Sequence, residues 1–165
     1  MRRRRLGPLA LWALAQAGFL GAGEPVVVGS WRLVSNDEHR TDGTVHPVWG
    51  SRPAGRLVYD AGGRMSIQLM DPRRGRFASA DRVAGTTEET KQAFDGYLAY
   101  FGSYTVDAAA ETVTHHVEGS LFPNLIGTDQ RRSFVISGNR LTLTTPPILG
   151  GERRSTYVLV WQREE

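Results

Sequence analysis

Residues 131–145 have the sequence RRSFVISGNRLTLTT, in which two runs rich in β-branched and apolar residues flank Ser137-Gly138-Asn139. Runs of this kind are typical of β-strands. Gly and Asn tolerate the positive φ angles of a tight turn, so the stretch predicts a hairpin of strands 131–137 and 140–145. Asp60-Ala61-Gly62-Gly63 has the same turn chemistry and predicts a second hairpin.

The same pattern recurs from Val26 onward, with Gly, Asp and Asn turn signals at roughly the spacing of a β-sandwich or barrel. Because consecutive hairpins favour an up-and-down arrangement, we expect an all-β fold, an eight-stranded antiparallel up-and-down barrel formed by residues 24–165. The predicted strands are Trp31–Asn36, Arg56–Tyr59, Arg64–Met70, Gly102–Asp107, Thr112–Gly119, Arg131–Ser137, Arg140–Thr145 and Ser155–Arg163.

One amphipathic helix interrupts the strands. Thr86 and Glu89 fit a capping box at its start. The pattern predicts a helix of about twelve residues that packs on the barrel through one apolar stripe at i, i+3, i+4 and i+7, formed by Phe94, Tyr97, Leu98 and Phe101. The long connections 46–55 and 71–85 could fold over a barrel mouth, with Trp49 as a lid or as a surface packing residue.

The first 23 residues have the features of a signal peptide. Arg2–Arg5 form a charged region, Leu6–Leu20 are mostly apolar, and small residues follow. A membrane-spanning helix needs roughly 20 apolar residues, so this interrupted stretch favours export over anchoring. The arginines also admit a twin-arginine signal. We therefore expect residues 1–23 to be removed by cleavage near residues 17–23, which leaves a periplasmic or secreted protein that does not associate with the membrane.

The basic charge of the chain belongs to this leader. The 165-residue chain has a net charge of +3, and removal of Arg2–Arg5, with no acidic residue among positions 1–23, leaves −1. The argument from charge for a nucleic-acid partner disappears with the leader, and we expect none. The remaining length suits a single domain.

Several chemistries are excluded or disfavoured by the motifs. The absence of cysteine excludes disulfides, thiolate metal sites and thiol catalysis. The sequence contains no serine-nucleophile elbow, phosphate-binding loop or dinucleotide fingerprint. His115 and His116 are adjacent, so on a strand they face opposite sides and cannot bind one metal ion together. We expect neither a cofactor nor a metal.

An ordered set of segments resembles the lipocalin-like domain of bacterial and fungal proteins, a relative of the calycin barrels. The set covers residues 28–163 and consists of Gly29-Ser30-Trp31, Gly55–Asp60, Ala99–Tyr104, Val113–Asn124, Gly138–Leu143 and Leu159–Arg163. The resemblance implies an eight-stranded barrel around a small cavity, with Trp31 of the Gly-x-Trp motif closing one end. Because the sequence lacks the disulfide and second motif of typical lipocalins, retinoid or haem binding is not implied.

Strand alternation identifies the residues that face the cavity. In strand 112–119, His115 shares a face with Val113 and Val117, where desolvation would keep it neutral. It is either a satisfied core histidine, or a ligand contact or acid–base group. In strand 131–137, Arg132 shares a face with Phe134 and Ile136.

A buried guanidinium requires a partner, and for Arg132 that could be a protein carboxylate or an anionic ligand. Arg132 could instead pack on Trp31, as resemblance to lipocalins implies. Tyr59, Tyr104 and Trp31 complete the predicted ligand-binding set, although wall and core roles are the simpler interpretation for the tyrosines. Asn124 could cap its loop or face the mouth.

Three interpretations of function remain. The favoured one is an exported, non-enzymatic protein whose cavity binds a small, largely apolar molecule with a polar or anionic end. The alternative is a cofactor-free isomerase, cyclase or dehydratase acting on a small natural-product-like substrate, with His115 as catalytic acid or base. The third is a structural envelope protein whose barrel is filled by side chains.

Overall fold

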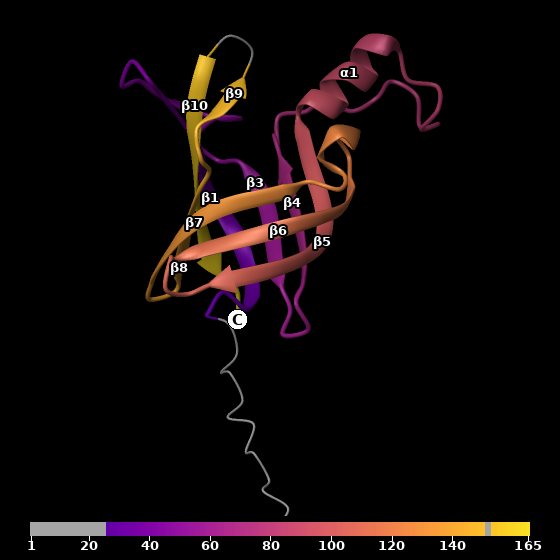
Figure 1. Ribbon diagram of the computed structural model, residues 1–165. Helices are drawn as coiled ribbons and strands as arrows, with labels where there is room; N and C mark the ends of the chain where they lie inside the picture. The colour runs from indigo at the N-terminus through magenta and orange to yellow at the C-terminus, as the bar shows by residue number, and fades with distance from the viewer. Residues whose placement is uncertain (1–25, 151–152) are drawn as a thin grey trace, which may run out of the picture.

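The computed structural model describes residues 26–150 and 153–165, and the predicted signal peptide, residues 1–23, lies outside them. The chain forms a closed antiparallel barrel of eight strands in up-and-down order, as the sequence predicts (Figure 1). The barrel closes where the last strand pairs with the first. Its strands are β1 (Gly29–Arg40), β3 (Ala54–Tyr59), β4 (Arg64–Met70), β5 (Tyr97–Asp107), β6 (Thr112–Ser120), β7 (Asp129–Ser137), β8 (Arg140–Thr144) and β10 (Arg153–Arg163).

Both predicted hairpins are confirmed. Strands β3 and β4 pair across residues 60–63, where Gly63 has a φ of 80°. Strands β7 and β8 pair across residues 138–139, where Gly138 has a φ of 59°. These positive φ angles explain why glycine occupies both turns.

The end of the barrel beside the C-terminus is closed by Trp31, whose side chain is fully buried. Its Nε1 donates a hydrogen bond to the Val27 carbonyl oxygen at 2.9 Å. The Arg163 guanidinium covers the indole at 4.0 Å from the ring centroid and donates to the Val28 carbonyl oxygen at 2.6 Å. The role of capping Trp31, considered above for Arg132, therefore belongs to Arg163.

The remaining short elements gather at the opposite end (Figure 1). These are β2 (Val45–Pro47), which pairs with β1, β9 (Ile148–Gly150), which pairs with β10, and the helix α1 (Thr87–Asp95). The single-turn helix η1 (Pro123–Leu125) follows β6. Asn124 in this turn is exposed. The open end is thus where the irregular parts of the chain lie.

The predicted helix stripe is wrong for three of its four residues, because only Phe94 lies in the helix, whereas Tyr97, Leu98 and Phe101 lie in β5. The capping box of Thr86 and Glu89 is present, but α1 ends at Asp95 and its cap is Gly96. The chain then enters β5, where Tyr97 pairs with Met70 of β4. Pairing of this segment with strands on both sides outweighs its helical spacing. Phe101 consequently points outward and is 57% exposed.

Helix α1 itself covers little of the barrel. No residue of α1 is buried, and Phe94 and Asp95, at its last turn, line the mouth of the interior cavity. The helix therefore stands at the rim instead of lying along the sheet, as Figure 1 shows.

Candidate ligand cavity

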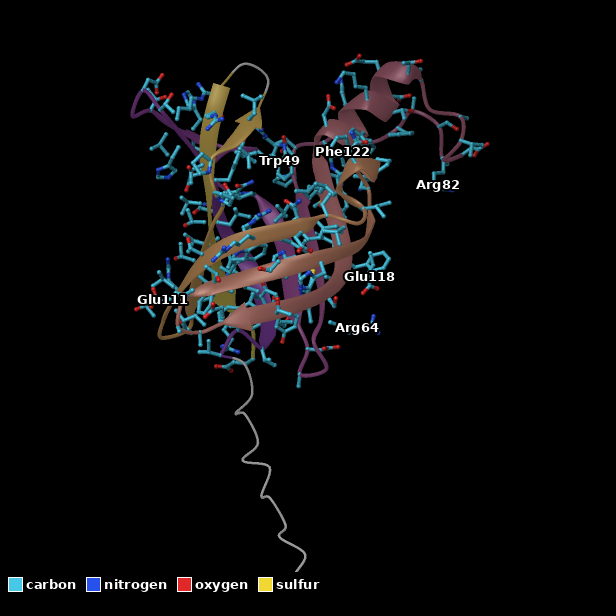
Figure 2. All side chains as sticks on the ribbon, in the orientation of Figure 1. Trp49, Arg64, Arg82, Glu111, Glu118 and Phe122 are labelled. Atoms are coloured by element: carbon cyan, nitrogen blue, oxygen red, sulfur yellow. The ribbon has the colours of Figure 1, made fainter. Side chains whose placement is uncertain are left out.

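A cavity of about 360 Å³ occupies the open half of the barrel. This volume lies within the range of about 300–1,000 Å³ that is typical of small-molecule sites. Trp49 and Phe122 lie at the open end (Figure 2). Most of the wall is apolar, and it is formed by Val48, Trp49, Ile67, Leu69, Phe94, Leu98, Phe122, Leu143, Ile148 and Leu159 with the polar or mixed residues Asn36, Asp95, Tyr97, Tyr100, His115, Arg132, Thr145 and Tyr157.

His115 lies in the wall between two tyrosines. Its side chain is fully buried. The Tyr59 hydroxyl lies 2.6 Å from Nε2, and the Tyr100 hydroxyl lies 2.8 Å from Nδ1. Alternation along β6, β3 and β5 turns all three side chains inward from different strands. The result is a hydrogen-bonded cluster that runs from the barrel interior to the cavity surface.

Burial lowers the pKa of His115 from its ordinary value of 6.5 to about 3, and the positive charges of Arg132 and then His116 act in the same direction. The imidazole is therefore neutral at physiological pH. A neutral ring has one N–H donor and one acceptor nitrogen, so the two tyrosines must play different roles toward it.

The burial of Tyr59 determines which role each tyrosine takes. Within the described chain, His115 Nε2 is the partner of the buried Tyr59 hydroxyl. Because a buried O–H without an acceptor is costly, we infer that Tyr59 donates to Nε2 and that Nδ1 carries the proton. Nδ1 then donates to Tyr100 Oη, which leaves the Tyr100 proton to donate into the cavity.

Arg132 supplies the positive charge at this part of the wall. It donates to the Arg131 carbonyl oxygen at 2.8 Å and to Gln130 Oε1 at 3.4 Å. Among the ion pairs of the described residues, none involves Arg132. Burial raises the pKa of Tyr100, and the charge of Arg132 and its hydrogen bond oppose that rise. Tyr100 and Arg132 together can offer hydrogen-bond donors toward the cavity that they line.

The other predicted site residues lie apart from the cavity. Tyr104 packs against Tyr59 with ring centroids 4.7 Å apart and donates to the Asp60 carbonyl oxygen at 2.7 Å. Tyr59 lies behind His115, and Trp31 closes the far end of the barrel. Tyr104, Tyr59 and Trp31 therefore do not line the cavity. Of the predicted set, His115 and Arg132 line the cavity.

Sequence reasoning missed Tyr100 and Asn36. Tyr100 lies in the segment that was predicted to be helical; once that segment is a strand, Tyr100 and Tyr104 fall on one face. Asn36 faces inward because of an irregularity in β1, where the register with β10 shifts between Leu33 and Ser35. A single-sequence pattern carries no signal for that shift.

Two properties of the described residues bear on other kinds of site. They contain no group of three or more His, Cys, Asp or Glu side chains arranged to hold a metal ion. No helix among them is long and apolar enough to cross a membrane.

A closed up-and-down barrel with an apolar cavity open at one end defines a small-molecule-binding barrel of the calycin type. The model of the lipocalin-like domain family matches residues 28–164, and the chain belongs to this family. A relative in Aspergillus oryzae (strain ATCC 42149 / RIB 40) is the 4'-hydroxy-3'-methoxypropiophenone carrier protein, which is 37% identical over 107 residues, covering 60% of this chain and 96% of the relative.

Proposed function

We propose that this protein is an exported carrier that binds one small, largely apolar molecule with a polar or anionic end in the barrel cavity. The observation that supports the proposal is the cavity of about 360 Å³ in the open half of the barrel. Its mostly apolar wall includes the hydrogen-bond donors of Tyr100 and Arg132. Ligand sites in proteins combine an apolar wall with a few placed polar groups in this way.

The class of ligand follows from the same wall. An acceptor such as a ketone or carboxylate oxygen would satisfy the unpaired charge of Arg132 and the free proton of Tyr100. The relative's name specifies an aromatic ketone, a molecule with an apolar ring and one such acceptor. We therefore propose compact aromatic carbonyl compounds as the ligand class.

Binding without chemistry is favoured over the enzymatic alternative by the state of His115. With its pKa lowered to about 3 and both nitrogens hydrogen-bonded to tyrosines, this imidazole is poorly suited to take up a substrate proton near neutral pH, where general bases have a pKa close to the working pH. The histidine positions Tyr100 for ligand binding.

A cavity-filling variant tests the carrier function. The probe is 4'-hydroxy-3'-methoxypropiophenone, and its binding is measured by isothermal titration calorimetry. Leu143→Trp fills the cavity and is expected to abolish detectable binding. Val135→Trp puts the same side chain on the outer face of β7, where Val135 is 60% exposed, and is expected to leave binding unchanged.

The matched pair separates cavity binding from surface adsorption. Equal binding by wild type and the Leu143→Trp variant, with both proteins folded, would contradict a site inside the barrel. Turnover of the probe to a new product by wild type would instead favour the enzymatic alternative.

Export is a separate part of the proposal and rests on the arginine and apolar pattern of residues 1–23. We expect the protein isolated from the periplasm or medium to begin near residues 17–24. N-terminal sequencing of the mature protein checks this, and a protein that keeps Met1 and stays inside the cell would contradict it.

A further inference from the structure

One buried polar side-chain atom of a residue in the cavity wall has no hydrogen-bond partner among the described residues. The side chain of Asn36 lines the cavity and is 5% exposed. No donor in the described chain forms a hydrogen bond with its Oδ1. Buried side-chain oxygens are nearly always hydrogen-bonded, so an unpaired buried acceptor on a residue that lines a cavity indicates that a molecule in the cavity supplies the donor.

The backbone of β1 is shaped to bring Asn36 to this place. Trp31 and Leu33 are buried on the inner face, and simple alternation would next turn residue 35 inward. The register shift between Leu33 and Ser35 inserts one residue, and Asn36 becomes the next buried position. Bulges that re-aim a side chain are over-represented beside functional sites.

Asn36 is held in position by its backbone. It pairs with Leu159 of β10 on one side, and its carbonyl oxygen accepts a hydrogen bond from the Val48 amide at 2.8 Å on the other. The side-chain amide is thus mounted on a fixed strand, next to the loop that carries Trp49. A fixed, unpaired acceptor discriminates between ligands that can donate a hydrogen bond and ligands that cannot.

Asn36 and the Tyr100–Arg132 donors lie on different sides of the cavity. Strands β10 and β8 separate β1 from β7 around the eight-stranded barrel. One wall therefore offers an acceptor, and a wall across the cavity offers donors, with apolar side chains between them. This arrangement complements a molecule with a hydroxyl at one end and an acceptor oxygen at the other.

We propose that Asn36 is a specificity-determining residue whose Oδ1 accepts a hydrogen bond from a hydroxyl group of the carried molecule. The ligand class is thereby narrowed from aromatic carbonyl compounds to hydroxylated ones, phenols or alcohols. This assignment rests on the proposed carrier function.

The test compares two probes on each of three proteins by isothermal titration calorimetry. The probes are 4'-hydroxy-3'-methoxypropiophenone and its analogue that lacks only the ring hydroxyl. The proteins are wild type, Asn36→Leu, which removes the acceptor at similar side-chain size, and Asn139→Leu, which makes the same substitution at an exposed position of the β7–β8 turn, outside the cavity lining.

Wild type and Asn139→Leu are expected to prefer the hydroxylated probe by about tenfold, as one net hydrogen bond provides. In Asn36→Leu this preference is expected to disappear, so that the two probes bind with about equal affinity. The affinity for the analogue is expected to equal that of wild type or exceed it. Each preference is a ratio of two affinities measured on the same protein. Partial unfolding of a variant lowers both affinities by the same factor and therefore does not change the ratio.

A preference that is the same in Asn36→Leu as in wild type would overturn the role of Asn36 and leave the carrier function standing. Binding of neither probe by folded wild type would overturn the proposed function and the assignment with it. As a second readout, the side-chain amide resonances of Asn36 in nitrogen-15 NMR spectra should shift with the hydroxylated probe more than with the analogue; equal shifts would contradict the assignment.

Discussion

We predict that acid destabilises this protein through His115. Burial lowers the pKa of the folded-state imidazole from 6.5 to about 3, whereas the unfolded chain takes up the proton near its ordinary pKa. The stabilising effect of the neutral ring is therefore complete above about pH 6.5 and is lost as the pH falls toward 3. The free energy of unfolding falls by about 1.4 kcal/mol per pH unit in this window, which makes about 3 kcal/mol by pH ~4.5.

The assay is urea unfolding at about pH 7.5 and pH 4.5 for wild type and for His115→Gln. The glutamine amide can still hydrogen-bond to Tyr59 and Tyr100, but it does not titrate. Carboxylates whose pKa is lowered in the fold, such as Glu38 and Asp71, are present in both proteins and cancel in the comparison. Wild type should lose about 3 kcal/mol more than the variant between these pH values. An equal loss in both proteins would refute a buried, neutral His115.

Two further predictions concern the closed end and the strand pairing. Arg163→Ala removes the cation over Trp31 and a charged hydrogen bond to the backbone. Thermal and urea unfolding should therefore show that the free energy of unfolding falls by about 2–3 kcal/mol. A fall as small as that caused by an average surface mutation would show that the Arg163 cap is dispensable. Gly102→Ala would place a Cβ 2.0 Å from the backbone oxygen of His116 and should cost about 1–3 kcal/mol. In the matched control Gly75→Ala, the added Cβ has no neighbour within 4 Å, so stability should change by less than about 0.5 kcal/mol. Similar stability losses in the two alanine variants would contradict the close packing of β5 against β6.

Local sequence patterns predicted the barrel well because strand period and turn chemistry are local properties. The turns at residues 60–63 and 137–139 specify their hairpins by the φ angles that glycine allows. Alternation also places His115 and Arg132 on the inner face, since the side-chain period of a strand is fixed. These inferences need only a few neighbouring residues.

The failures have tertiary causes. Tyr97–Phe101 have a helical spacing of apolar residues, but pairing with β4 and β6 makes them a strand. The bulge that turns Asn36 inward depends on the match between β1 and β10, strands at opposite ends of the sequence. The identity of the Arg that caps Trp31 depends on the same closure. A single sequence gives the faces of strands, but long-range register decides which side chains meet.

The most direct test of cavity binding is an isotope-filtered NOE experiment on the complex with 4'-hydroxy-3'-methoxypropiophenone. The probe's ring protons should show NOEs to methyl groups of Ile67, Leu143 and Leu159, which line the cavity. The methyl groups of Val135, on the outer face, should show none. NOEs to Val135 without any to the three interior residues would contradict the proposal that the barrel encloses its ligand.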